Sequence, residues 1–166
     1  DSQLLLEPVF PPEHLVIAGA GHIGRALAHL GNLLGFDVTV IDDRKEYANH
    51  ENIPDADHII VKDIGMALGE MKKGADTYIV IVTRGHKDDA DALKPCIGSG
   101  LAYLGMIGSK KKIAAMKHEF IEKGYATIEQ WNNIYAPIGI EIGSQTVEEI
   151  AVSIAAQLVQ VRNSKK

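Results

Sequence analysis

The chain has 166 residues, and its 17 Lys and Arg against 22 Asp and Glu give a formal net charge of −5. An apolar share of 46% and a charged share of 23% are typical of a folded globular domain, which excludes a disordered chain. The acidic balance disfavours nucleic acid or an anionic membrane surface as a partner. Because Cys96 is the only cysteine, an intramolecular disulfide is excluded, and we expect a reducing, cytoplasmic location.

Neither a membrane segment nor a metal site is predicted. No apolar stretch of the sequence approaches the roughly 20 residues that cross a bilayer. The seven histidines are not spaced with cysteine or carboxylate groups as tetrahedral metal sites require. Pro8, Pro11 and Pro12 lack amide donors, so residues 1–13 are predicted to be an extended lead-in or linker, and residues 14–166 one domain.

From Leu15 onward, short apolar runs alternate with segments of helical periodicity. Strands are predicted at residues 15–18, 38–41, 58–61, 78–82 and 102–107. Helices are predicted over residues 23–34 with Gly35 at the end, along a stripe of Ala90, Leu93 and Ile97, and from Ile113 to Gly124. Capping boxes at Thr127 with Gln130 and at Thr146 with Glu149 predict two more, the second with Ile150, Ile154, Leu158 and Val161 inside. Buried strands joined by helical crossovers indicate a doubly wound, mostly parallel α/β sheet with helices on both faces.

A complete G-x-G-x-x-G pattern follows the first predicted strand and opens the first helix, formed by Gly19, Ala20, Gly21, His22, Ile23 and Gly24. In this context the pattern is typical of a Rossmann-like dinucleotide site. Gly19 is expected to allow the tight turn, Gly21 the approach of a phosphate, and Gly24 close packing of helix on strand. The alternative is a related fold whose glycines serve packing alone.

Acidic residues end the second predicted strand. Asp42 stands where a carboxylate accepts hydrogen bonds from a ribose diol. Asp42 and Asp43 would repel a ribose 2′-phosphate, with Arg44 offsetting part of the repulsion, so NAD is favoured over NADP if a dinucleotide binds.

Two further clusters follow the fourth and fifth strands. Thr83, Arg84, Gly85 and His86 are expected to face the same crevice as Gly21, with Asp89 orienting the His86 ring; alternatively, His86 and Asp89 cap the next helix. His22 could equally touch a ligand or face solvent. Ser109 is a predicted N-cap followed by Lys110, Lys111 and Lys112, which suit a bound anion or form a solvated face. Cys96 is interpreted as a core residue rather than a nucleophile.

Taken together, these motifs resemble the Rossmann domain of the XdhC/CoxI family, accessory proteins of xanthine dehydrogenase and related molybdenum hydroxylases. The resemblance covers nearly the whole chain. It rests on residues 14–22, 40–44, 83–86 with Asp89, 105–110, 136–143 and 148–154. Lys110, Lys111 and Lys112 replace arginines common in the family, Val147 replaces a frequent proline, and Arg84 stands where another residue is common, which puts the anion specificity in doubt.

The resemblance implies an accessory protein that holds molybdenum cofactor (molybdopterin), helps its sulfuration and delivers it to the apo-hydroxylase. Family members usually carry a further N-terminal domain with a cysteine motif, so the start at Asp1 and the prolines are expected to mark a domain boundary or a natural single-domain relative. The alternatives are an NAD-dependent oxidoreductase, with His86 as its acid or base, and a nucleotide-sensing regulatory module that could form a homodimer.

Overall fold

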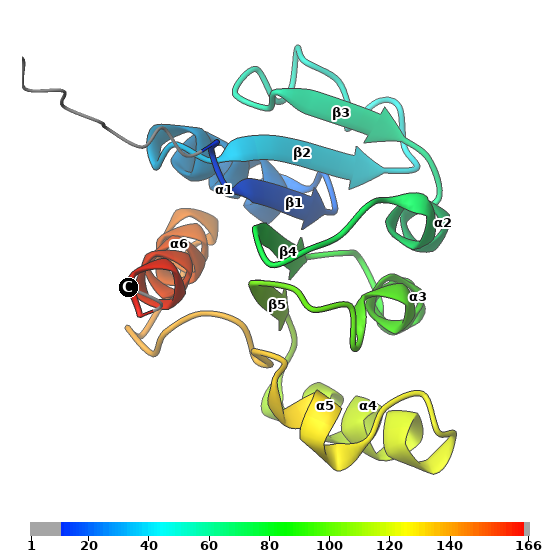
Figure 1. Cartoon of the computed structure of the whole chain (residues 1–166). Helices are drawn as coiled ribbons and strands as arrows, with labels where there is room; N and C mark the ends of the chain where they lie inside the picture. Colours follow the sequence, from blue (N-terminus) through cyan, green and yellow to red (C-terminus); the bar gives the residue numbers. More distant parts are fainter. Residues whose placement is uncertain (1–10, 165–166) are drawn as a thin grey trace, which may run out of the picture.

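The computed structural model describes residues 11–164. Its sheet has five parallel strands in the order β3-β2-β1-β4-β5: β1 (His14–Ala18), β2 (Asp37–Asp42), β3 (His58–Val61), β4 (Thr77–Ile81) and β5 (Tyr103–Met106) (Figure 1). The predicted doubly wound α/β fold is therefore confirmed. The lead-in predicted for residues 1–13 falls mostly outside the described residues, and β1 begins at His14.

Helices cover both faces of the sheet (Figure 1). On one face, α1 (His22–Leu33) and α6 (Val147–Asn163) bury Leu27, Ile154 and Leu158 against the strands. On the other face lie α2 (Ile64–Glu70), α3 (His86–Leu93) and α4 (Lys110–Glu122), with the short α5 (Ile128–Asn132) beyond them. Because successive side chains of a strand point to opposite faces, Ile17 packs toward α1 and α6 while Val16 packs toward the other layer.

Most of the predicted element ends match the structure. Gly35 and Gly124 end α1 and α4 with φ of 80° and 69°, the left-handed conformation that favours glycine. Both predicted capping boxes are present, Thr127 with Gln130 and Thr146 with Glu149. Turn chemistry at these positions is local, which makes it visible in the sequence.

Two helical predictions need correction. The stripe through Ile97 is wrong in its last member, because α3 ends at Leu93 and a 3-10 turn (Lys94–Cys96) follows. Pro95 has no N–H group with which to continue a helix. The seven-residue α2 was not predicted, since it is too short to show a clear apolar period; Asp63 caps it by accepting from the N–H of Met66 at 2.8 Å.

The segment after α5 extends the sheet beyond β5 and is then tied to α6. Tyr135 exchanges backbone hydrogen bonds with β5, donating to the Leu104 carbonyl and accepting from the Met106 N–H. Gln157 of α6 accepts from the Tyr103 hydroxyl at 2.6 Å and from the Gly139 N–H at 2.9 Å. Since both donors share one amide oxygen, Gln157 fixes α6, β5 and the loop around Gly139 relative to one another.

Candidate functional site

The glycine loop joins β1 to α1 at the carboxyl edge of the sheet. Gly19 has φ of +122°, and a Cβ added there would lie 2.5 Å from the Val82 carbonyl oxygen. A Cβ added at Gly24 would lie 1.9 Å from the Gly19 carbonyl oxygen. The turn role of Gly19 and the packing role of Gly24 are therefore confirmed, and both positions require glycine.

Gly21 differs from its neighbours because a Cβ added there would meet no atom within 4 Å. Its backbone is extended, with φ of −73°, so neither strain nor crowding calls for glycine. The open space beside Gly21 is what the approach of a phosphate would need. The phosphate itself stays a prediction.

The N-terminus of α1 carries no negative charge of its own. Gly21 is the N-cap residue, no side chain caps the helix, and the first turn has no acidic residue. By contrast, the first turns of α5 and α6 have both a capping threonine and a glutamate. Free N–H groups and the helix dipole make the start of α1 favourable for an anion.

Asp42 closes β2 and binds the glycine loop. Its carboxylate, 2% exposed, accepts four hydrogen bonds: one from the Ala20 N–H and three from the N–H, Nε and Nη2 of Arg44, at 2.8–3.0 Å. Burial opposes ionisation, but the hydrogen bonds from Arg44 and Ala20 outweigh it and lower the pKa of Asp42 to about 2. A ribose diol would have to displace Arg44 to reach these oxygens.

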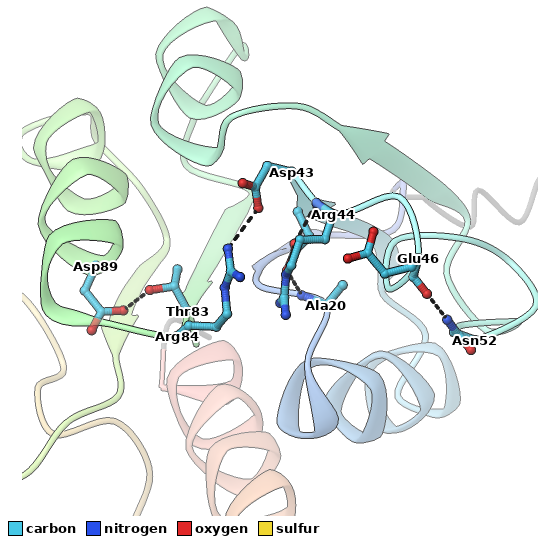
Figure 2. A network of polar contacts seen from close by, with 9 residues as sticks. Ala20, Asp43, Arg44, Glu46, Asn52, Thr83, Arg84 and Asp89 are labelled. Atoms are coloured by element: carbon cyan, nitrogen blue, oxygen red, sulfur yellow. Dashed lines mark hydrogen bonds and ion pairs between the residues drawn. The ribbon is translucent and has the colours of Figure 1, made fainter.

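The two arginines near the loop have different partners (Figure 2). Arg44 is held on Asp42 and lies over the Tyr47 ring, 4.0 Å from its centroid. Arg84, from the end of β4, reaches across to Asp43 at 3.3 Å, and both side chains are about half exposed. The expectation that Arg44 offsets the charge of Asp43 therefore needs correction, since Arg84 pairs with that carboxylate.

The predicted pairing of Asp89 with His86 is wrong. Asp89 is fully buried and accepts from the Thr83 hydroxyl and from Lys112 Nζ, each at 2.5 Å. His86 instead pairs with Glu119 of α4 at 3.4 Å. The capping alternative is also wrong, since the N-cap of α3 is Gly85 and no side chain caps that helix. Lys112, which the sequence suggested only as one of three similar lysines, is the buried partner in this cluster.

The remaining predicted residues lie at the β5 end of the edge. Ser109 caps α4 by accepting from the N–H of Lys112 at 3.2 Å. Lys110 lines a separate cavity of about 320 Å³ whose wall includes Ile138 and Ile142. The structure thus brings together Ala20, Asp42, Asp43, Arg44, Thr83 and Arg84 (Figure 2), whereas His86 and Lys110 make their contacts elsewhere.

Cys96 is a core residue, as interpreted from the sequence. Its side chain is 1% exposed, its thiol donates to the Ala92 carbonyl at 3.3 Å, and burial raises the pKa of the thiol to about 12. Within residues 11–164, no group of three or more His, Cys, Asp or Glu side chains could hold a metal ion. Likewise, none of the helices in this range is long and apolar enough to span a membrane.

Several known proteins are similar to this chain. It is 35% identical over 151 residues to uncharacterized protein YqeB of Escherichia coli K12, and 28% identical over 164 residues to a protein of Bacillus subtilis 168 named as a probable xanthine dehydrogenase component. The crystal structure of a xanthine dehydrogenase from Bacillus halodurans superposes with a TM-score of 0.82 at 31% identity, covering 94% of this chain. The chain spans 27%, 46% and 44% of these three proteins, respectively. Residues 15–158 match the XdhC Rossmann domain, and the chain belongs to that family.

Proposed function

We propose that this domain holds the phosphate-bearing molybdenum cofactor for an apo molybdenum hydroxylase of the xanthine dehydrogenase type. The observation that carries the proposal is the open space at Gly21 beside an α1 N-terminus that has neither a capping side chain nor an acidic residue. A terminal phosphate is the kind of group that such a place stabilises, through N–H donors and the helix dipole. The likeness to proteins named for xanthine dehydrogenase supports the choice of client.

The residues at the edge of the sheet fit a pterin phosphate. The main-chain N–H groups of Gly21, His22 and Ile23 would hold the phosphate, and Gly19 and Gly24 keep the loop in the required shape. Arg84 is held by one exposed ion pair, worth at most about 1 kcal/mol, so it can turn from Asp43 toward a ligand anion. The bound cofactor would supply the molybdenum chemistry of the client enzyme, while this domain binds and presents it.

Sulfur chemistry must come from another protein in this proposal. A thiol can carry or transfer sulfur only as an accessible thiolate, and Cys96 is buried with a raised pKa. We therefore propose two partners for the complete accessory protein: a sulfurating enzyme and the apo-hydroxylase. The domain itself acts without forming a covalent bond.

An NAD-dependent oxidoreductase has less support. Its ribose acceptor, Asp42, already accepts four hydrogen bonds, and its best acid or base, His86, is exposed and paired with Glu119. A regulatory nucleotide sensor uses the same glycine loop but has no specific observation in its favour.

Titration of the purified chain with molybdenum cofactor, and separately with NAD, tests the proposal. We expect the cofactor to bind, and Gly21→Val to weaken binding while leaving the thermal melting temperature unchanged, because the added side chain enters open space. Spectroscopic turnover of NAD with a candidate substrate, or a Gly21→Val variant that binds cofactor as tightly as the wild type, would contradict it.

A further inference from the structure

A cavity of about 520 Å³ lies beside the glycine loop, between α1 and the start of α6. Ala26, Ile53, Pro54 and Val147 give it apolar walls, and Arg25 and Glu148 lie on it with opposite charges. His22, the first residue of α1, also lines it, so the cavity begins where the open space at Gly21 ends. Its volume is within the range of about 300–1,000 Å³ that is usual for small-molecule sites.

Arg25 brings an unpaired positive charge to this cavity. Its guanidinium has no hydrogen-bond or ion-pair partner among residues 11–164, and the side chain is exposed. A cation so near the start of a helix opposes the helix dipole unless an anion is bound there. Arg25 is four residues after Gly21, about 6 Å along the helix axis, and helical side chains lean toward the N-terminus. The guanidinium can therefore reach a phosphate at Gly21.

The other charged groups of the cavity favour a ligand with hydrogen-bond donors. Asp55 is already paired with His29 at 3.0 Å, and its negative charge is thereby partly offset. Glu148 has no side-chain partner within the described part of the chain and lies in the first turn of α6. Between Arg25 and Glu148, the apolar walls suit a flat ring whose N–H edge a carboxylate could accept.

The crevice predicted from the sequence, between the ends of β2 and β4, suits such a ligand less well. The cavity there measures only about 40 Å³. Asp43, Asp63, Asp88 and Asp91 line it, and its one arginine, Arg84, is paired with Asp43. Both the space and the charge balance thus favour the cavity between α1 and α6.

We infer that the body of the ligand lies in the cavity between α1 and α6, with Arg25 on its phosphate and Glu148 on its ring edge. The ligand class is a phosphate monoester of a planar bicyclic nitrogen heterocycle, a chemistry that a purine nucleotide and a pterin phosphate share. This inference rests on the proposed function and moves the ligand body away from Thr83 and Arg84.

Calorimetric titration of the complete 166-residue chain with 5′-GMP, metal-free molybdopterin and inorganic phosphate tests the inference. Arg25→Gln keeps the length of the side chain and removes its charge, so we expect about tenfold weaker binding of the heterocyclic probes, as for one lost charge-assisted hydrogen bond. Ala26→Trp fills the cavity and should abolish binding of these probes while inorganic phosphate still binds. Lys111→Gln, which removes an exposed cation on α4, should leave all affinities unchanged. The ratio of the GMP and molybdopterin affinities distinguishes a nucleotide from a pterin.

Two results would overturn the inference, and they differ in what they leave standing. If Arg84→Gln weakens the heterocyclic probes while Arg25→Gln does not, the ligand lies in the β2–β4 crevice and only the inference fails. If the wild type binds none of the three probes, the proposed function fails with it. Thermal melting of each variant controls for folding, and Arg25→Gln is decisive even if Ala26→Trp misfolds, because Arg25 is exposed.

Discussion

Asp42→Asn should destabilise the domain far more than the same change at the neighbouring residue, Asp43. Asp42 is 2% exposed and joins the glycine loop to the end of β2 through Ala20 and Arg44. Its pKa falls from 3.8 to about 2, which corresponds to about 2 kcal/mol of stability at neutral pH. Removing the charge also leaves the largely buried Arg44 unpaired, so the total loss should be about 2–4 kcal/mol.

Urea unfolding of the wild type, Asp42→Asn and Asp43→Asn measures this difference. Asp43 is half exposed and forms one ion pair, so Asp43→Asn should cost less than about 1 kcal/mol. In thermal melting, Asp42→Asn should lower the midpoint by roughly 5–10 °C for a domain of this size. The matched substitution at Asp43 controls for a general loss of negative charge.

The same prediction has a defined pH dependence. The folded-state pKa of Asp42 is depressed, so its contribution is present above the unfolded value of 3.8 and is lost as the pH falls toward about 2. The difference between the wild type and Asp42→Asn should therefore narrow between about pH 4 and pH 2. Equal stability of the two proteins at pH 7, or a difference that does not narrow in acid, would refute the role assigned to the Asp42 carboxylate.

Three further predictions follow from packing and burial. Gln157→Leu should cost about 2–4 kcal/mol in urea unfolding, because the buried Tyr103 hydroxyl loses its acceptor; an unchanged midpoint would contradict this. Gly24→Ala should unfold at a clearly lower temperature than Gly21→Ala, since only at Gly24 does an added Cβ meet a carbonyl oxygen, at 1.9 Å. Cys96 should react with a disulfide reagent only as fast as the domain opens, given its raised pKa and 1% exposure, and rapid labelling of the native protein would show otherwise.

Patterns local in sequence predicted most of the fold. The apolar strands, the glycine pattern at residues 19–24 and the two threonine capping boxes each depend on residues a few positions apart, and the structure contains all of them. The helix α2 was missed because seven residues with two glycines show little periodicity. The error at Ile97 came from extending an apolar stripe past Pro95.

The side-chain partners at the site could not be predicted in the same way. Arg84 and Asp43 are 41 residues apart, and Lys112 and Asp89 are 23 apart. The sequence placed these charges near the edge of the sheet but could not choose among neighbours of opposite sign. Asp89 was therefore assigned to His86, which is nearer along the chain, and Arg44 was assigned to Asp43. The cavity beside Arg25 depends on α1, α6 and the loop before β3 meeting in space.

The central claim, that the main-chain N–H groups at the start of α1 bind an anion, can be measured residue by residue. Titration of the ¹⁵N-labelled chain with inorganic phosphate should shift the amide resonances of Gly21, His22 and Ile23 in a saturable way. The same titration of Gly21→Val should lose these shifts, whereas Gly69→Val, at an exposed glycine whose added Cβ has its nearest contact at 4.0 Å, should retain them. Amide resonances at α1 that stay unchanged, while those of α3 or α4 respond, would contradict the account.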